Sequence, residues 1–264
     1  MSRVSMHSHR LIVALASAAL ALGCATTGSK AQQQENAQRA RSHYDIGTEH
    51  LHNDQVELAL REYLAAATLQ PRNPDYQLAV GLAYIQKERY VEAEQHLRLA
   101  LEVTPDFHVA RLNLSSLLLG LGRFEEARVE AQRLYDDPTF AGPWQALSNR
   151  GWAEYQLGRV DEARETFALA RKINPTYWPA LLNLGILESE QGRRPEAIQL
   201  FEAVISQRPP PGPDAVAEAN FRLGEIYVSL GKRNRAVGYL TAAVVKAPSG
   251  PWGKKSEQAL KQLR

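Results

Sequence analysis

The side chains of this chain that could do acid–base or metal chemistry are few and scattered. Its 264 residues include seven histidines and a single cysteine. His50 and His52 are two residues apart, which puts them on different faces of a helix and excludes the i, i+4 pair of a helical metal site. His43 and His50 share a helix face but have no third ligand in an obvious place. The sequence therefore predicts no metal site.

Other catalytic patterns are also missing from the sequence. The pair Asp136-Asp137 precedes Pro138 and is more typical of a turn than of an acid–base pair. We find no Gly-rich phosphate loop, no Gly-x-Ser-x-Gly motif and no zinc-type cysteine cluster. Without its first 23 residues the chain carries 29 basic and 29 acidic side chains, which argues against nucleic acid as a partner. We expect a non-enzyme with no cofactor and no small-molecule substrate.

The cysteine has one chemical role that fits its place, which is acylation. A basic start, the apolar stretch Leu11–Leu22 and then Ala21-Leu22-Gly23-Cys24 match a bacterial lipobox. About a dozen apolar residues are too short to span a bilayer of ~30 Å but suit a signal peptide. We expect residues 1–23 to be cleaved and Cys24 to carry a covalent lipid such as palmitate. The alternative is ordinary cleavage near Ala25, which would release a soluble protein.

The residue after the cysteine bears on location. It is Ala25 and not the aspartate associated with inner-membrane retention in enteric bacteria. We therefore expect a lipid anchor in the outer membrane, with the protein facing the periplasm. Residues 24–39 are polar without sustained apolar periodicity and predict a flexible tether.

A repeat fills the rest of the chain. Small residues recur with other positions in phase, at intervals of 34, 34, 36, 34 and 39 residues. In the first helix of each unit they are Gly47, Gly81, Ser115, Gly151, Gly185 and Gly224, and in the second Ala59, Ala93, Ala127, Ala163, Ala197 and Ala236. Small residues let two helix backbones approach closely, and a proline that follows ends the second helix. The insertions at 136–144 and 209–213 are either tolerated loops or points where curvature changes.

This pattern resembles the tetratricopeptide repeat (TPR) family. The resemblance implies an all-α, right-handed TPR solenoid of six helix-pair repeats with a C-terminal capping helix, in which function lies on a stacked surface. The repeats span 40–249, with approximate limits 40–73, 74–107, 108–143, 144–177, 178–216 and 217–249. The capping helix is expected at 250–264, where Ala259, Leu260 and Leu263 share a face.

In a TPR stack the first helices line the concave face, so their inward positions predict a partner-binding groove. These positions form an apolar stripe with amides beside it, although about half of them could pack against neighbouring repeats instead. Evenly spaced amides could bond an extended peptide backbone. The predicted groove residues are Tyr44, Leu78, Leu82, Ile85, Leu112, Asn113, Leu119, Asn149, Trp152, Tyr155, Leu182, Asn183, Ile186 and Phe221.

Charge is unevenly placed along the chain. Residues 208–264 hold ten Lys and Arg against four Asp and Glu, a net charge of +6. Such a segment could face anionic lipid or an acidic protein, or it could be only a solvated face. The sequence leaves these three alternatives open.

The turn Tyr135–Phe140 and the following Ala146-Leu147-Ser148-Asn149-Arg150-Gly151 resemble the outer-membrane pilotin lipoproteins of type IV pili. This is the PilF, PilW and Tgl family, and the chain is most similar to its Tgl members from gliding myxobacteria. The resemblance implies that the partner is the outer-membrane secretin of the pilus (PilQ-like), which the protein would help to multimerise. Pilus biogenesis and pilus-dependent motility would then depend on it. The alternative is a generic TPR lipoprotein adaptor for cell-wall enzymes or for outer-membrane protein assembly.

Overall fold

The structure is a computed structural model that describes the backbone of residues 8–263 and the side chains of residues 30–263. Throughout this range the regular structure is α-helical, in thirteen helices. The chain divides into two compact units, Met1–Ala110 and Arg111–Arg264. The all-α class and the TPR helix pairs predicted from the sequence are confirmed.

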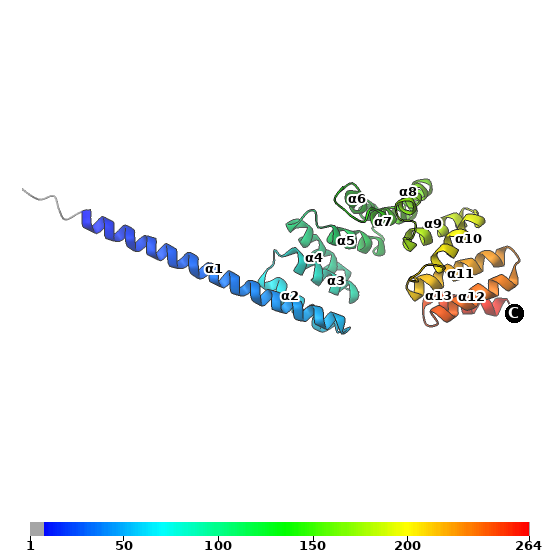
Figure 1. The fold of residues 1–264 in the computed structure, drawn as a ribbon, viewed down its shortest axis with the longest axis horizontal. Coiled ribbons are helices and arrows are strands. Elements are labelled where there is room, and N and C mark those ends of the chain that lie inside the picture. The colour runs from blue at the N-terminus through cyan, green and yellow to red at the C-terminus, as the bar shows by residue number, and fades with distance from the viewer. Residues whose placement is uncertain (1–7, 264) are drawn as a thin grey trace, which may run out of the picture. The chain divides into compact units, whose positions relative to one another are not determined.

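The first unit consists of two antiparallel helix pairs (Figure 1). It contains α1 (Ser8–His52), α2 (Val56–Leu69), α3 (Pro74–Gln86) and α4 (Tyr90–Val103). Helix α1 packs against α2, and α3 packs against both α2 and α4.

The second unit continues the same alternation and ends on an unpaired helix. Its helices are α5 (His108–Gly120, which starts at the boundary), α6 (Phe124–Tyr135), α7 (Pro143–Gln156), α8 (Val160–Ile173), α9 (Trp178–Glu190), α10 (Arg194–Ile205), α11 (Pro213–Ser229), α12 (Arg233–Lys246) and α13 (Pro251–Gln262). Helix α13 packs on α11 and α12, in the place that a further first helix would take. The helix predicted from Trp252 onward is therefore present.

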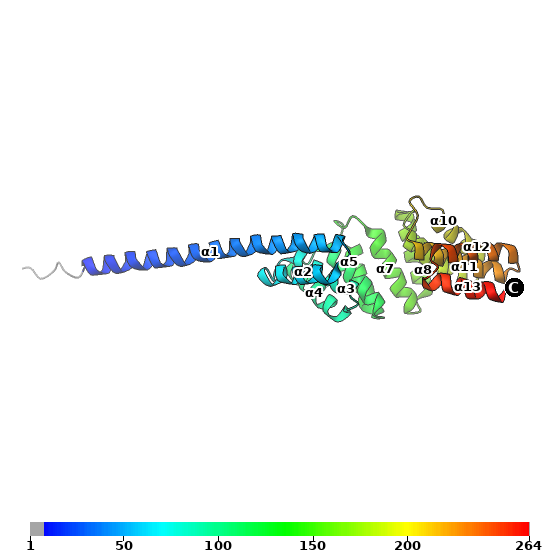
Figure 2. The ribbon, with the colours of Figure 1, turned by 90° about the horizontal axis from the view of Figure 1, so that it is seen from below.

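The segment predicted to be a flexible tether is helical instead. Helix α1 runs without interruption from Ser8 to His52, and its N-terminal part projects beyond α2 (Figures 1 and 2). The physical reason is composition, because Ala31 to Arg41 contains almost only Ala, Gln, Glu and Arg, which are strong helix formers. Residues 30–35 are exposed on every side, which explains why no apolar periodicity marks this part of the helix.

The predicted signal peptide and Cys24 lie outside the residues whose side chains are described. Among the residues that the structure does describe, no helix is long and apolar enough to cross a membrane.

Within each pair the turn between helices has a recurring left-handed residue. Gly158 has φ of 77°, and the amide of Arg159 donates to the carbonyl of Glu154 at 2.9 Å, which closes the end of α7. Gly122, Gly192 and Gly231 repeat this conformation. In the first two repeats Asp54 and Glu88 take the same backbone region, each with φ of 58°. Glycine thus ends the first helix in four of the repeats.

The core is a close contact between the small residue of each first helix and a large residue of the second. A Cβ added to Gly185 would lie 2.7 Å from Cε1 of Phe201, and one added to Gly151 would lie 2.8 Å from Phe167. Phe167 and Phe201 are fully buried. The ring of the second helix thus packs directly on the backbone of the first, and the glycine makes room for it.

This contact predicts opposite effects for two Gly-to-Ala changes. Gly185→Ala should destabilise the fold by about 1–3 kcal/mol, because Phe201 must shift, even though alanine favours helix by ~0.5–1 kcal/mol. Gly238→Ala, on an exposed part of α12 with no atom within 4 Å of the added methyl, should stabilise by that smaller amount. Urea unfolding followed by circular dichroism measures both. Equal destabilisation by the two variants would contradict the packing described here.

Candidate functional site

The predicted groove residues all lie on first helices, and they divide between the two units. Tyr44, Leu78, Leu82 and Ile85 belong to the first unit, and the others belong to the second. Leu182, Ile186 and Phe221 are buried, whereas the rest are half-buried. The inner faces are therefore apolar surfaces packed on the core. The buried residues Leu182, Ile186 and Phe221 contribute mainly to packing.

In the first unit the inner face begins with an aromatic cluster. The ring centroid of Tyr44 lies 5.6 Å from that of Tyr63 on α2 and 5.2 Å from that of Tyr76 on α3. Leu78, Leu82 and Ile85 continue along α3 at helical spacing. The cluster joins α1 to the next repeat, so Tyr44 contributes to packing as well as to the surface.

In the second unit Trp152 and Tyr155 of α7 lie side by side, with ring centroids 5.2 Å apart. Both rings pack against the buried cluster that contains Leu182 and Ile186 of α9. The hydroxyl of Tyr155 donates to Glu190, also on α9. Burial and this hydrogen bond together raise the pKa of Tyr155 to about 12, so the phenol keeps its proton at neutral pH. The two rings are half core and half surface, and they couple neighbouring repeats.

The amides predicted to form a ladder differ in their engagement. Asn149 Nδ2 donates to Ser115 Oγ at 2.7 Å and to Ser116 Oγ at 2.9 Å, which ties α7 to α5. Both amide hydrogens are thus used within the protein, and only the carbonyl oxygen is left for a ligand. The half-buried side chain of Asn183 makes no hydrogen bond within the described residues, so it is the better-placed amide.

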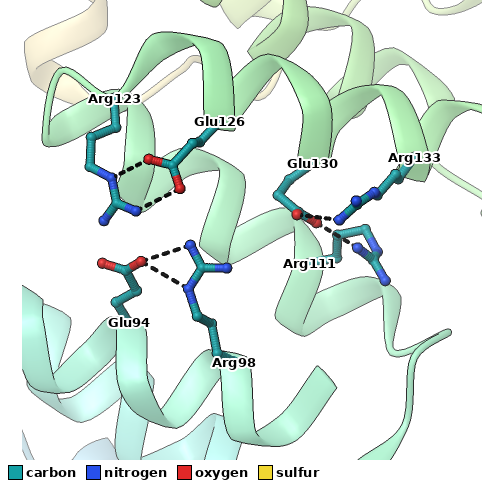
Figure 3. Close-up of polar contacts among 7 residues, drawn as sticks. All are labelled: Glu94, Arg98, Arg111, Arg123, Glu126, Glu130 and Arg133. Carbon is teal, nitrogen blue, oxygen red and sulfur yellow. Dashed lines mark hydrogen bonds and ion pairs between the residues drawn. The ribbon is translucent and has the colours of Figure 1, made fainter. Parts of the chain in front are cut away.

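Arginines pair with the carboxylates of the second helices, and one such pair, between Arg111 of α5 and the buried Glu130 of α6, joins two helices. In the second unit Glu130 accepts from Arg111 at 2.5 Å and from Arg133 at 2.7 Å, while Arg123 donates to Glu126 at 2.6 Å (Figure 3). Figure 3 also shows the first unit's pair between Arg98 and Glu94, at 2.8 Å. Each acidic group in this view faces an arginine, which is an arrangement for packing and not for proton transfer.

The same device recurs one repeat apart on α7 and α9. Glu154 is fully buried and accepts from Arg150 at 2.6 Å and from Thr166 of α8 at 2.7 Å. Glu188 accepts from Arg164 of α8 at 2.9 Å and also contacts Arg193. These acids are 34 residues apart in the sequence, as the repeat requires. Removing Glu154 would leave Arg150 without its ion-pair partner, and removing Glu188 would do the same to Arg164 and Arg193.

A cavity of about 630 Å³ opens between α11 and α13. Its apolar wall is formed by Phe221, Val228, Ala259 and Leu263, and its polar edge by Glu225, Ser229, Lys255, Gln258 and Gln262. Val228 is 42% exposed, which is high for a large apolar side chain. An apolar hollow with a few polar groups at its edge is the usual form of a ligand or peptide site.

Sequence reasoning identified only Phe221 of this cavity. The cavity residues on α13 were predicted only as part of a capping helix. Because α13 packs where a further first helix would lie, it also lines the inner face. The shared face of Ala259 and Leu263 was recognised in the sequence, but it was assigned to shielding the last repeat and not to lining a cavity.

The remaining candidate chemistry is structural. His43 pairs with Glu62 at 2.7 Å and His50 with Gln55 at 2.7 Å, so the two histidines that share a face have separate partners. No group of three metal-ligating side chains forms among the described residues. Asp137 Oδ1 accepts from the amide of Thr139 at 2.8 Å and from its hydroxyl at 2.6 Å, as a turn-forming aspartate does.

Comparison with known families agrees with this geometry. Models of the tetratricopeptide repeat match residues 44–106, 112–177, 154–215 and 221–251. The chain belongs to the TPR family. TPR proteins are typically scaffolds for protein interaction.

Two solved structures share the fold over nearly their whole length. PilW, a type IV pilus biogenesis factor, aligns with a TM-score of 0.69 and 20% identity over 82% of this chain and 97% of PilW. PilF of Pseudomonas aeruginosa aligns with a TM-score of 0.67 and 16% identity over 85% of this chain and 99% of PilF. These values show a common TPR fold.

Curated relatives match over only a fraction of their own length. The human protein O-mannosyl-transferase TMTC3 is 27% identical over 225 residues, which is 77% of this chain and 24% of TMTC3. The CTR9 homolog of Arabidopsis thaliana is 28% identical over 136 residues, 51% of this chain and 12% of that protein. The TPR segment is what they have in common with this chain.

The two amides of the inner face give a test. Asn149→Ala should destabilise the TPR fold by about 1–2 kcal/mol, since Ser115 and Ser116 lose their donor, whereas Asn183→Ala should change stability by less than about 0.5 kcal/mol. Thermal melts of the two variants provide the measurement. A neutral Asn149→Ala variant would show that the bridge between α5 and α7 contributes nothing to stability.

Proposed function

We propose that this TPR protein is an outer-membrane pilotin lipoprotein, which binds the secretin of the type IV pilus and promotes its assembly into multimers. The observation that carries the proposal is the near-complete alignment with PilW and PilF, which extends over 97% and 99% of those chains. The CTR9 homolog and TMTC3, by contrast, are matched over only 12% and 24% of their length. The extent of these alignments thus favours a role like that of PilW and PilF over that of the curated relatives.

Two sequence features support the same proposal. The lipobox ending in Cys24 supplies a membrane anchor, and the turn at Tyr135–Phe140 resembles the pilotin family in sequence. Two hydrogen bonds stabilise this turn in the structure. The carboxylate of Asp137 accepts from the amide of Thr139, and the amide of Phe140 donates to the carbonyl of Asp137 at 3.1 Å. The turn fixes the start of α7, which carries Asn149, Trp152 and Tyr155.

The proposed mechanism is capture at a membrane. Acyl chains on Cys24 would hold the protein at the inner leaflet of the outer membrane. A secretin segment would lie along the inner face of α7, α9 and α11, with an apolar side chain in the cavity between α11 and α13. Tethering raises the local concentration of secretin monomers and so favours the ring without new contacts between them.

The anchor is tested by Cys24→Ala. This variant should be lost from outer-membrane fractions, because acylation supplies nearly all of the membrane affinity. Fractionation on a sucrose gradient, with immunodetection of the protein, is the measurement. Outer-membrane retention equal to that of the parent would overturn the lipoprotein assignment.

The cavity is tested by Val228→Lys, which places a charge on its apolar wall. A lysine suits the end of α11, since a cation is favourable at a helix C-terminus, so folding should be preserved. Affinity for the secretin should fall by about 2 kcal/mol, or roughly thirtyfold. In cells the secretin should then run as monomer and not as heat-resistant multimer.

The matched control is Ile173→Lys, which changes a large apolar side chain of nearly equal exposure at the C-terminal end of α8, outside the cavity. It should leave multimers unchanged. Multimers in both variants would remove the cavity from the site, and normal multimers after deletion of the whole gene would favour a generic adaptor over a pilotin. Trp152→Ala and Tyr155→Ala are weaker tests, since both rings support the core.

A further inference from the structure

Helix α12 carries only positive charge. It contains Arg233, Arg235 and Lys246 and no acidic residue, and Lys232 directly precedes it. The segment 208–264 as a whole has a net charge of +6. The structure shows that part of this charge is gathered on one outer helix of the second unit.

The outward face of α12 differs from that of every other second helix. Counted from the buried alanine of each second helix, four positions point away from the core, at −2, +2, +5 and +9. In α12 they are Asn234, Gly238, Thr241 and Val245, all exposed and uncharged. In the other second helices each set includes an exposed carboxylate: Glu57 of α2, Glu102 of α4, Glu125 of α6, Asp161 and Glu165 of α8, and Glu202 of α10.

One exposed valine lies on this face and a second lies beside it, with basic side chains along one edge. Val245 is 72% exposed, more than any other large apolar side chain in the described residues, and Val237 is 37% exposed. On one edge Arg235 donates to the hydroxyl of Tyr227 at 3.2 Å and lies over its ring, which stacks on Tyr239. Lys246 lies in the last turn of the helix on the same edge. Glu202 is the neighbouring acid, and it accepts a hydrogen bond from Tyr239 at 3.0 Å.

We infer that the outward face of α12 lies on the anionic surface of a lipid bilayer. Val245 and Val237 enter the boundary of the acyl region, and Lys246, Arg235 and Lys232 reach lipid phosphates around them. Exposed apolar side chains with lysines and arginines beside them are typical of helices that lie at a membrane surface. The inference does not depend on the partner of the inner face.

An acidic protein is the other surface with the required charge. Protein interfaces are anchored by buried aromatic and arginine side chains that fit matching hollows. The outward face of α12 instead presents asparagine, glycine, threonine and valine, which are smaller than the arginine and lysine side chains beside them. Long basic side chains with apolar stems suit the headgroup layer, where the stem is buried and the charge stays hydrated.

The test uses the full chain and its single cysteine. Cys24→Ser removes the only thiol, and Val245→Cys then places an environment-sensitive nitrobenzoxadiazole label on the proposed face. The matched control is Lys172→Cys, the same register position on α8, nine residues after its buried alanine. Vesicles of pure phosphatidylcholine are compared with vesicles of equal parts phosphatidylcholine and phosphatidylglycerol. Because the label reports its own surroundings, membrane attachment through the N-terminus does not change the comparison.

The label at 245 should shift to shorter wavelength on the anionic vesicles and not on neutral ones, and the label at 172 should not respond. Lys232→Glu with Lys246→Glu should lower the apparent vesicle affinity by about tenfold or more, since each basic residue near an anionic surface contributes several-fold. Arg171→Glu with Lys172→Glu, an equal change of charge on α8, should leave the response of the label at 245 unchanged.

Three results would overturn the inference. They are equal responses at 245 and 172, a response at 245 that persists after charge reversal on α12, and a response to poly-glutamate in place of anionic vesicles. The last result would assign the face to an acidic protein. Thermal melts of each variant accompany the measurement, and because labelled α8 and α12 variants carry the same number of changes, a general loss of fold would affect both series.

Discussion

The contact of a large side chain with the backbone of a neighbouring helix determines the rest of this structure. Phe167 and Phe201 lie where a Cβ on Gly151 or Gly185 would stand less than 3 Å away, so α7 and α8, and likewise α9 and α10, can approach this closely only with glycine at that place. This close approach fixes the relative rotation of the two helices. It therefore decides which positions of each first helix point inward and which positions of each second helix point outward.

Much of this was predictable because it is local. The small residues recur at intervals of 34 to 39 residues, and a left-handed turn residue, which is glycine in four repeats, follows each first helix, so one sequence shows the same pattern several times. Helix ends agree for the same reason: α2 ends at Leu69 and α4 at Val103, two residues before Pro71 and Pro105. The repeat also gave the inner positions, since register follows from helix geometry alone.

What the sequence did not predict depends on contacts between repeats. Asn149 had the spacing of a ligand-binding amide, but its hydrogens go to Ser115 and Ser116 of another helix pair. Trp152 and Tyr155 had the spacing of surface anchors, but they also pack on α9. The cavity between α11 and α13 arises because α13 takes the place of a further first helix. The polar composition of α13 is typical of a capping helix and did not indicate that it lines a cavity. The helical course of residues 24–39 was missed because periodicity marks only helices with a buried face.

First and second helices are thus packed differently, and this difference gives their exposed faces different roles. A first helix is packed on two sides by second helices and on its ends by neighbouring repeats, so its inner face is apolar and preorganised for a protein segment. A second helix has one free side, where the usual solution is charge of both signs, as with Glu125 and Arg128 of α6, whose side chains pair at 2.6 Å. Helix α12 departs from this solution by lacking carboxylates altogether. A solvated face gains nothing from that departure, whereas a face that contacts anionic lipid does, because each carboxylate there would repel the surface that the arginines and lysines attract.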